Sequence, residues 1–518
     1  MWLRKVSSCR PFCITHRNYM SASHLQDTAF LRSMPTEQAR RNSSSNLKLL
    51  PAQGSFTKEF PELPILEFDS RGDEISADVP KLRIRTCTWN LAGKSPRDDF
   101  THLLGIHPPV KVATPVVKEF ADSLSENLYG QGEAPAVHAE AEEADVLAIG
   151  FQELSSNPVA PVMETVVMSE IWTSTLRKIL SSRDYVLLQT IRLQGILLLC
   201  FCKSQHLRHV RNLDTSYLRL GASGWWGNKG AVGISFDVRG VSVCFVNSHL
   251  SPHDHAFEER VRNYRQVLAD LSFSSVRTDV STILEHDYAF WLGDFNFRIE
   301  GISQDKTLHY IEALKWPKLL KHDQLRRAAH MSGAFSTFKE GKIEFPPTYK
   351  FVQGTDTYDM RNPAKIRRPS YCDRILWRTR NASKKAQLIE YRSHMEYNIS
   401  DHKPVTAVFE IALGSDKEQF VVFDPIDRWY IGENGYFRYS AKPGLYYSSW
   451  DWIGLFKTTY TSFSDYVTWL WTPGGKADNL GCINGRYITK TGRFLLIYFS
   501  SEHRCGVGFS DPFEITSV

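Results

Sequence analysis

The chain has 518 residues but no apolar run of the ~18 residues that a membrane-spanning helix needs. Its densest apolar run, Gly195–Cys202, has only the length of a buried strand. The segment before Asp27 is basic and lacks the apolar core of a secretion signal, so we expect a disordered basic tail rather than a transit peptide. The sequence therefore predicts a protein that is neither secreted nor membrane-spanning.

Cysteine pairs and nucleophile motifs are also missing. The nine cysteines form no CxxC pair, which argues against a disulfide scaffold and a zinc site and favours a reducing intracellular compartment. Neither a GxSxG motif nor a CxxxxxR phosphatase loop is present, so nothing indicates a covalent enzyme intermediate. The net charge of +5 is too small to predict nucleic-acid binding by itself, although it allows a local basic pocket for an anionic substrate.

The composition changes twice along the chain. Residues 1–80 are rich in Ser, Arg, Asn and Pro without a hydrophobic period, and are predicted to form a disordered tail. Residues 81–413 combine short apolar strand-like runs with an amphipathic helix at 256–268, and they include a probable loop or insertion at 97–143. Residues 420–518 contain short strands separated by turn signals, which predicts a separate all-β sandwich.

Polar residues lie at the ends of apolar runs at six places in the central domain. They are Asn90, Glu153, Asn247 with His249, Asp294 with Asn296, Asp373, and Asp401 with His402. Asp294 and Asn296 are two residues apart, so in a strand their side chains would point to one side. Asp373 could orient His402 and leave Asp401 free to face a metal ion or a water molecule.

Each cluster also has an ordinary structural explanation. Glu153 could cap a helix, His249 could be a core histidine, and Asp294 with Asn296 could form a turn. Asp373 and Asp401 could also lie near His402 only because all three are at a strand edge, without any catalytic role. Taken together, the clusters favour a shared site, because strand ends in a layered sheet converge on one rim. The chemistry that suits them is metal-assisted hydrolysis of a phosphate ester, since Mg²⁺ prefers oxygen ligands and imidazole and amide donors stabilise phosphoryl oxygens.

A series of ordered motifs supports this interpretation, because together they resemble a known protein family. The segments WN, FQEL, GWWGNKGAVGISF, NSHL, GDFNFR, PPTYKF, RRPSYCDRILW and SDHKPV occur in this order within residues 82–413. Together they resemble the inositol polyphosphate 5-phosphatase family of the endonuclease/exonuclease/phosphatase superfamily. The resemblance implies an α+β four-layer sandwich of two packed sheets with helices outside. Residues 420–518 resemble the SKICH domain, a β-sandwich that directs a few members of this family to membranes and partner proteins.

The resemblance implies a role for each residue of the site. Glu153 and Asn90 would bind Mg²⁺. Asp294 would position and activate water, Asn296 would contact phosphate, and Asp401 would support the metal ion or the water.

Other residues would hold the phosphate that is hydrolysed and the rest of the substrate. His402, oriented by Asp373, would stabilise the scissile phosphate, and His249 would contact the same group. The remaining substrate-binding residues resemble the elements of the family that bind the 4-phosphate or lie near the 1-phosphate. Those for the 4-phosphate are Tyr349, Lys350, Lys365 and Arg367, and those near the 1-phosphate are Asn228 and Lys229.

The implied activity is magnesium-dependent hydrolysis of the 5-phosphate of phosphatidylinositol 4,5-bisphosphate, the 3,4,5-trisphosphate and soluble inositol polyphosphates. The implied partners are phosphoinositide membrane lipids, soluble inositol phosphates and proteins that bind the SKICH-like domain, with no nucleic acid. We also expect a cytoplasmic protein, peripheral at the endoplasmic reticulum and recruited to the plasma membrane, that dampens phosphoinositide 3-kinase and insulin signalling. Two alternatives stay open: a nuclease of the same superfamily, and a catalytically weak protein that acts through its SKICH-like domain.

Overall fold

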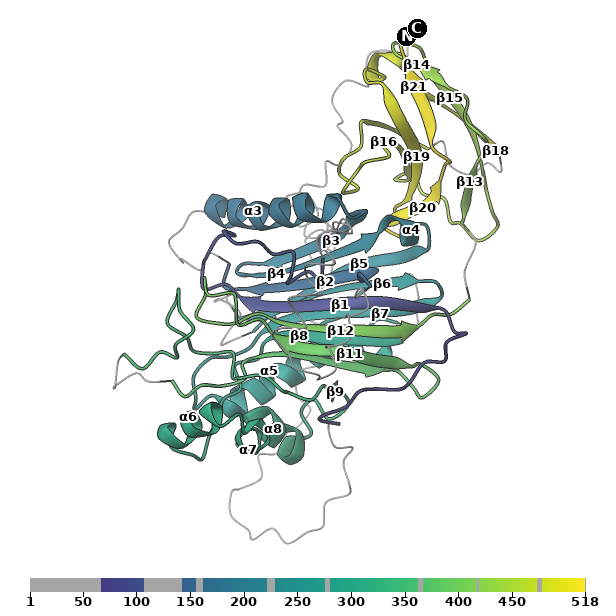
Figure 1. Cartoon of the computed structure of the whole chain (residues 1–518). Helices are drawn as coiled ribbons and strands as arrows, with labels where there is room; N and C mark the ends of the chain where they lie inside the picture. The colour runs from purple at the N-terminus through teal and green to yellow at the C-terminus, as the bar shows by residue number, and fades with distance from the viewer. Residues whose placement is uncertain are drawn as a thin grey trace, which may run out of the picture. The chain divides into compact units, whose positions relative to one another are not determined.

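Two six-stranded sheets form the centre of the protein (Figure 1). The computed structural model describes residues 67–106, 142–154, 162–220, 229–274, 280–361, 367–415, 419–472 and 478–517. The first sheet has the strand order β11-β12-β1-β2-β4-β3 and the second has the order β5-β6-β7-β8-β10-β9.

The strands of the first sheet are β1 (Lys81–Asn90), β2 (Val146–Gln152), β3 (Tyr185–Leu193), β4 (Ile196–Lys203), β11 (Ala386–Ser393) and β12 (Val405–Ala412). Those of the second sheet are β5 (Val210–Arg219), β6 (Gly230–Val238), β7 (Val241–His249), β8 (Tyr288–Asp294), β9 (Lys339–Glu340) and β10 (Asp373–Thr379).

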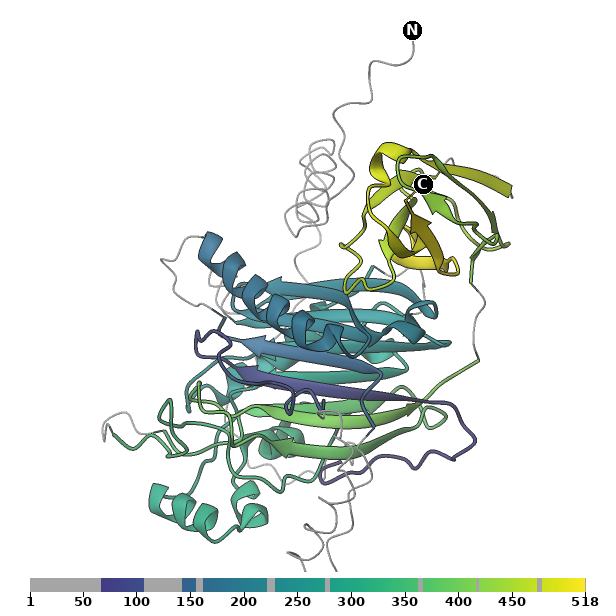
Figure 2. The same ribbon diagram turned by 45° about the horizontal axis from the view of Figure 1, so that its top comes forward.

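Helices lie on the outer side of each sheet. Trp172 and Leu176 of α3 (Val162–Ser181) pack on the first sheet, where they join Trp89 and Phe151 in one apolar cluster. α5 (Phe257–Asp270) and α8 (Gln324–Ser332) pack on the second sheet, together with Trp291 of β8. Figures 1 and 2 show α3 on the side of the strands away from α5 and α6. The remaining helical turns are α4 (Ser204–Leu207), η2 (Ile283–Glu285), α6 (Gln304–Glu312) and α7 (Trp316–Leu320).

The main core lies between the two sheets. Leu198 of β4, Phe245 of β7 and Phe409 of β12 belong to one buried apolar cluster that contains residues from both sheets. Every residue of β8 is buried, as expected for a continuous apolar run with packed layers on both faces. The layers are thus helix, sheet, sheet and helix, which confirms the predicted α+β four-layer sandwich. The amphipathic helix expected at 256–268 is α5.

Strand register brings the polar strand ends of the second sheet into one row. His249 pairs with Gly230 of β6 on one side and with Asp294 of β8 on the other. Asp294 in turn pairs with Asp373, the first residue of β10. Residues that are far apart in sequence therefore lie side by side at one rim of the sheet.

A buried ion triad anchors β10 next to Asp373. The guanidinium of Arg374 donates to both carboxylate oxygens of Glu340 at 2.6 Å and to Asp323 at 2.9 Å. All three side chains are fully buried. The two-pronged geometry suits the planar guanidinium, and it fixes β10 to β9 and to the loop before α8.

Residues 67–80, which the sequence analysis assigned to the disordered tail, lie against the central domain. Glu67 forms a parallel bridge with Lys339, and Gly72 forms an antiparallel bridge with Gln387. Ile75 is buried. The packed part of the chain therefore begins before residue 81, because backbone pairing compensates for the weak hydrophobic pattern of this segment.

The C-terminal residues form a separate all-β unit, as predicted. A three-stranded sheet has the order β13-β15-β18, and a larger sheet has the order β14-β21-β19-β16-β17 with β20 beside β19. Phe437, Leu455 and Leu496 are buried. The elements are β13 (Val421–Phe423), β14 (Trp429–Tyr430), β15 (Gly435–Ala441), β16 (Trp452–Lys457), β17 (Thr468–Trp471), β18 (Asp478–Ile483), η4 (Gly485–Tyr487), β19 (Gly492–Ser500), β20 (Cys505–Phe509) and β21 (Phe513–Thr516).

The ion triad predicts a large effect of Arg374→Met on stability. The substitution leaves Glu340 and Asp323 buried without their cation, which should lower the free energy of unfolding by about 3–5 kcal/mol. Denaturant unfolding measures this loss. Lys342→Ala, which breaks only the exposed pair with Glu344, is the control and should change stability by less than about 1 kcal/mol. Equal losses in the two variants would contradict the anchoring role of the triad.

Candidate active site

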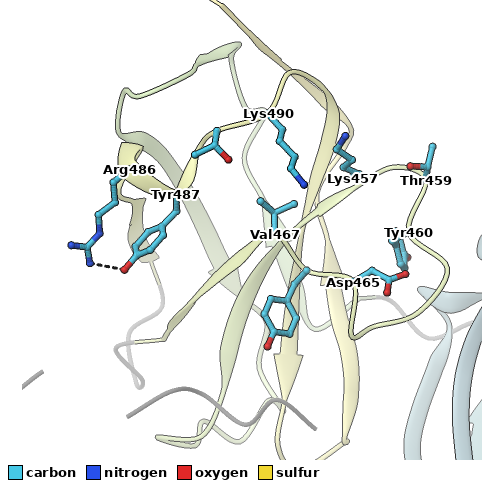
Figure 3. Close-up of a pocket in the computed structure, with 10 residues that line it drawn as sticks. Lys457, Thr459, Tyr460, Asp465, Val467, Arg486, Tyr487 and Lys490 are labelled. Carbon is cyan, nitrogen blue, oxygen red and sulfur yellow. Dashed lines mark hydrogen bonds between the residues drawn. The ribbon is translucent and has the colours of Figure 1, made fainter. Parts of the chain in front are cut away.

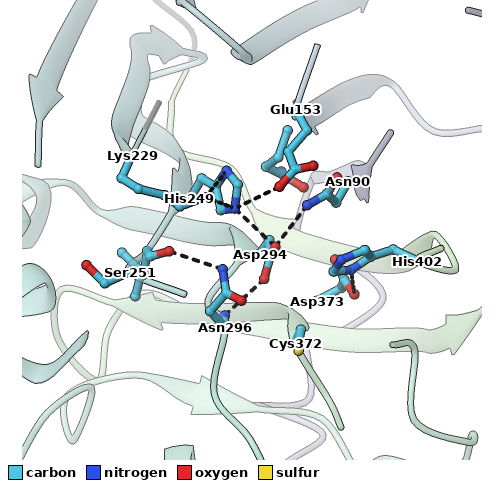
Figure 4. A network of polar contacts seen from close by, with 12 residues as sticks. Asn90, Glu153, Lys229, His249, Ser251, Asp294, Asn296, Cys372, Asp373 and His402 are labelled. Carbon is cyan, nitrogen blue, oxygen red and sulfur yellow. Dashed lines mark hydrogen bonds and ion pairs between the residues drawn. The ribbon is translucent and has the colours of Figure 1, made fainter. Parts of the chain in front are cut away.

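The site is built where the ends of strands from both sheets meet (Figure 4). Asn90, the last residue of β1, donates through its Nδ2 to Oδ2 of Asp294 at 3.0 Å. Nε2 of His249 lies 3.2 Å from the same oxygen. The three residues are almost completely buried. The expectation that polar strand ends share one rim therefore describes the structure.

Asp294 and Asn296 form a tight turn as well as part of the site. Asp294 is the last residue of β8, and its Oδ1 accepts the backbone N–H of Asn296 at 3.0 Å. Asn296 has a φ of 58°, a left-handed conformation that asparagine tolerates. Its Nδ2 donates to the carbonyl of Leu250 at 3.1 Å. The turn, and not the two-residue period of a strand, positions Asn296 beside Asp294.

Asp294 is held ionised by its neighbours. Burial alone would raise its pKa, but the hydrogen bond to His249 and the positive charges of His402 and Arg298 outweigh burial and hold the pKa well below its usual range. A carboxylate with such a pKa accepts hydrogen bonds throughout the neutral range.

His402 and Asp373 form a buried pair. Nδ1 of His402 lies 2.9 Å from Oδ2 of Asp373, which also accepts the hydroxyl of Thr348 at 2.6 Å. Burial opposes protonation of the imidazole, but Asp373, Asp294 and Asp401 overcome it and raise the pKa of His402 to about 9. His402 is therefore an imidazolium at neutral pH, with its ring orientation fixed by a carboxylate as the sequence predicted.

His249 has the opposite protonation state. Burial and the charge of Lys229 lower its pKa, although Asp294 and Glu153 act against this change. Nζ of Lys229 lies 2.7 Å from Nε2 of His249. Burial also lowers the pKa of Lys229 itself. One neutral and one charged imidazole thus face Asp294.

Oxygen donors suited to a hard cation gather beside this group. Glu153 follows β2 with a φ of 54°. Its Oε1 lies 3.8 Å from Nε2 of His249. Within the described residues, the Glu153 carboxylate forms no hydrogen bond, and its side chain is 37% exposed. A half-open carboxylate beside the Asn90 amide and the Asp294 carboxylate fits a cation such as Mg²⁺, which takes few protein oxygens and keeps several waters.

The predicted substrate-binding residues fall into two groups. The Tyr349 ring packs on His402 with centroids 4.4 Å apart, and Nζ of Lys350 lies 3.3 Å from Oδ2 of Asp401. Asp401 is thus paired with a lysine at the edge of the site. Arg367 lies farther along the same rim, where its Nη1 is 3.4 Å from Oδ1 of Asp254. Asn228 and Lys365 are outside the described residues.

Arg298 was not among the predicted site residues, although it ends the GDFNFR motif. It is buried, donates to Oδ1 of Asn296 and lies over the Tyr349 ring at 4.5 Å. Its Nε and Nη1 have no hydrogen-bond partner among the residues that the structure describes. A buried guanidinium that keeps unused donors beside Asp294 is suited to an anionic group of the substrate. The sequence feature that could have identified Arg298 as a site residue is its position four residues after Asp294 in the same motif.

Two facing sheets whose ends collect carboxylates, amides and histidines define a domain of the endonuclease/exonuclease/phosphatase class. The family model described as Endonuclease/Exonuclease/phosphatase family 2 matches residues 87–408, and the SKICH domain matches residues 421–515. The 5-phosphatase domain of SPsynaptojanin, solved with inositol (1,4)-bisphosphate and calcium ion, superimposes with a TM-score of 0.51. The two are 29% identical, over 65% of this chain and 87% of that domain.

Relatives over most of the chain narrow the class. The chain is 32% identical to mouse inositol polyphosphate 5-phosphatase K, over 84% of this chain and 90% of that protein. It is also 32% identical to rat phosphatidylinositol 4,5-bisphosphate 5-phosphatase A, but it spans only 42% of the length of that protein. The chain therefore belongs to the inositol polyphosphate 5-phosphatases, with a C-terminal SKICH domain, as its motifs predicted. Among the described residues, no helix combines the length and apolar character needed to cross a membrane.

The buried pair predicts how His402 titrates. In the wild-type protein its imidazole should lose its proton as the pH rises through about 9. Asp373→Asn removes the attraction that raises this pKa and leaves the burial that lowers it, so His402 should titrate at a lower pH. The stability that the pair contributes is complete below the ordinary histidine pKa of about 6.5 and is lost as the pH rises through the folded-state value.

Long-range nitrogen–proton NMR of the histidine rings measures both pKa values in the whole protein. The His394 ring, whose pKa burial lowers to about 4, serves as an internal reference that should not move. The same His402 pKa in the wild type and in Asp373→Asn would contradict the assigned pair.

Proposed function

We propose that this protein is a metal-dependent phosphatase that removes the 5-phosphate of phosphoinositides and soluble inositol polyphosphates. The single observation that carries the proposal is the close approach of a carboxylate, Asp294, and a histidine, His402, at one rim. Asp294 is held ionised and His402 is held protonated, and one donor atom of each lies within 4.8 Å of the other. The negative charge of Asp294 suits the orientation of a water molecule. The positive charge of His402 suits the stabilisation of a phosphoryl oxygen.

The reaction breaks the bond between phosphorus and the 5-oxygen of the inositol ring and forms a bond between phosphorus and a water oxygen. Asp294 orients the water and receives its proton as the new bond forms. Its lowered pKa makes it a weak base, which is sufficient because the transition state of phosphoryl transfer is loose and requires little deprotonation early. The 5-oxygen takes a proton from the solvent, and Asp294 gives the proton that it received back to the solvent, so the products are the inositol hydroxyl and inorganic phosphate.

Positive charge and hydrogen-bond donors hold the phosphoryl group. His402 donates from its imidazolium, and its orientation is fixed by Asp373. Within the described residues, Nε and Nη1 of Arg298 have no hydrogen-bond partner, and the Arg298 guanidinium contacts the Asn296 amide. Because these groups are buried and already oriented, they stabilise the developing charge without reorganising during the reaction. Glu153 and Asn90 would hold Mg²⁺, which supplies Lewis-acid stabilisation of phosphoryl oxygens when bound.

Specificity for inositol phosphates is attributed to the rim of the site. Lys350, Arg367 and the segment that contains Lys365 would bind the 4-phosphate, and the segment of Asn228 would lie near the 1-phosphate. The ammonium of Lys229 lies against His249, so we assign it to the phosphoryl group rather than to the 1-phosphate. Relatives that are named as 5-phosphatases, and one solved with inositol (1,4)-bisphosphate, support this substrate class.

The cellular role remains part of the proposal. Removal of the 5-phosphate would dampen phosphoinositide 3-kinase and insulin signalling. The SKICH domain would bring the enzyme to partner proteins and to the endoplasmic reticulum or plasma membrane.

Turnover of three substrates tests the activity. The protein with Mg²⁺ should release phosphate from phosphatidylinositol 4,5-bisphosphate vesicles and from inositol 1,4,5-trisphosphate, and should leave plasmid intact. Addition of EDTA should stop release. Plasmid nicking without phosphate release would support a nuclease instead, and no turnover of any substrate would support a protein that only binds.

Asp294→Asn tests the chemical role of the central acid. The substitution keeps the shape of the side chain and removes its charge, so kcat should fall by roughly 10²–10⁴-fold. Asp427→Asn, on the surface of the β-sandwich, removes the same charge far from the rim in sequence and should leave kcat unchanged. Wild-type turnover in Asp294→Asn would contradict the mechanism.

Lys350→Ala tests the assigned binding of the 4-phosphate. It should raise the KM for inositol 1,4,5-trisphosphate by about tenfold, because one charge-assisted contact is worth roughly 1.5–3 kcal/mol. For a substrate that lacks the 4-phosphate, the KM should change little. Lys342→Ala, an exposed lysine paired with Glu344, is the matched control. An equal increase for both substrates would assign Lys350 to a general electrostatic role.

A further inference from the structure

A hollow of about 480 Å³ opens on the C-terminal β-sandwich, in a part of the chain that has no role in the proposed reaction (Figure 3). Sheet register assembles it, since β16 pairs with β19 and Lys457 lies opposite Phe494. The hollow is lined by the end of β16, the segment that leads to β17, the turn η4 and the residues before β19. Its lining residues include Lys457, Thr459, Tyr460, Asp465, Arg486 and Lys490.

Three cations face this hollow without a carboxylate partner. Lys457, Arg486 and Lys490 are exposed, and none of them forms an ion pair within the described residues. Among the described residues, the Arg486 guanidinium donates only to the hydroxyl of Tyr487, at 2.5 Å. Figure 3 shows the side chains of Lys457, Lys490 and Val467 in the lining of the hollow. Cations that line one hollow without acidic partners attract an anion.

The one carboxylate in the lining cannot neutralise the lysines, because its oxygens are already used. Asp465 accepts the backbone N–H groups of Thr461 at 2.9 Å and of Ser462 at 3.0 Å. It also pairs with the guanidinium of Arg177 at 2.7 Å. The hollow therefore keeps a net positive charge.

The uncharged part of the lining favours a ligand that carries hydroxyl groups. Thr459 and Thr489 offer hydroxyls that both donate and accept, and Tyr460, Tyr466 and Tyr487 add phenolic groups and ring faces. Lysine and arginine pair with phosphate oxygens. A ring with several hydroxyls and one or more phosphates matches both kinds of lining, whereas a simple anion would use only the cations.

We propose that this hollow is a second binding site for a phosphorylated inositol, separate from the site of hydrolysis. Two sources share this chemistry, a soluble inositol phosphate and the headgroup of a phosphoinositide. A pocket on the SKICH domain would let the protein recognise this chemistry at one place while it hydrolyses a substrate at another.

The test uses the full chain without metal and compares two double variants that lose equal charge. Lys457→Ser with Lys490→Ser changes the hollow, and Arg428→Ser with Arg438→Ser removes two exposed cations elsewhere on the same domain. Calorimetric titration with inositol 1,4-bisphosphate should give two binding events in the wild type and in the control. The Lys457→Ser, Lys490→Ser variant should lose one of the two binding events, or its affinity at that site should fall at least about tenfold.

Vesicle sedimentation separates the two sources. Vesicles that contain phosphatidylinositol 4-phosphate should retain the wild type and the control but not the variant of the hollow if the headgroup is the ligand. Phosphatidylserine vesicles of equal charge measure general attraction. Loss of the calorimetric event without a change in sedimentation assigns the hollow to the soluble ligand, and either result supports the proposal.

Three results would overturn the proposal. The first is equal behaviour of the two double variants in calorimetry and in sedimentation. The second is an equal loss on phosphatidylserine vesicles, which would indicate only general electrostatics. The third is binding of a phosphoserine peptide as tightly as inositol 1,4-bisphosphate, which would show that the hollow does not select for a ring with several hydroxyls. Turnover of inositol 1,4,5-trisphosphate should be the same in all these proteins, so a failure here is distinguishable from a failure of the proposed catalysis.

Discussion

The register of the second sheet is the constraint on which the site depends. His249, Asp294 and Asp373 are opposite one another on three neighbouring strands, so a slip of one residue in any strand would turn a functional side chain to the other face. Close packing holds this register. Gly293 has a φ of 148°, and a Cβ at this position would lie 2.0 Å from the carbonyl oxygen of Ser248. β7 and β8 can approach this closely only because a glycine precedes Asp294.

Burial makes the charges of the site depend on one another. An isolated carboxylate or imidazolium in this interior would become neutral, because desolvation disfavours the charged form. Asp294 stays ionised because cations surround it, and His402 stays protonated because Asp373 and Asp294 face it. The same low dielectric keeps His249 neutral beside Lys229. The fold thus sets two imidazoles within one site to different protonation states, which gives a phosphoryl group both a charged and an uncharged neighbour.

The sequence could predict the groups that follow strong strand signals. Asp294 and His402 each come directly after or before an apolar run, and strand ends converge whatever the intervening loops do. It could not predict contacts set by chain segments without a pattern of their own. Arg374 reaches Glu340 and Asp323 over 34 and 51 residues of sequence, and no local period marks such partners. Strand alternation was the stated reason to place Asn296 beside Asp294, but a turn positions it there.

The two anion sites of this protein are built by opposite physical means. In the phosphatase domain, cations and carboxylates are buried together, so an incoming phosphate enters a balanced network and must compete with Asp294 and Asp373 for its donors. In the β-sandwich, Lys457 and Lys490 are exposed and form no ion pair with any residue that the structure describes, so an anion gains attraction at little desolvation cost but also with little orientation. The first arrangement favours selective stabilisation of a transition state, and the second favours reversible binding that weakens with salt. A chain that carries both can bind a phosphorylated inositol at the sandwich without the orientation that hydrolysis requires.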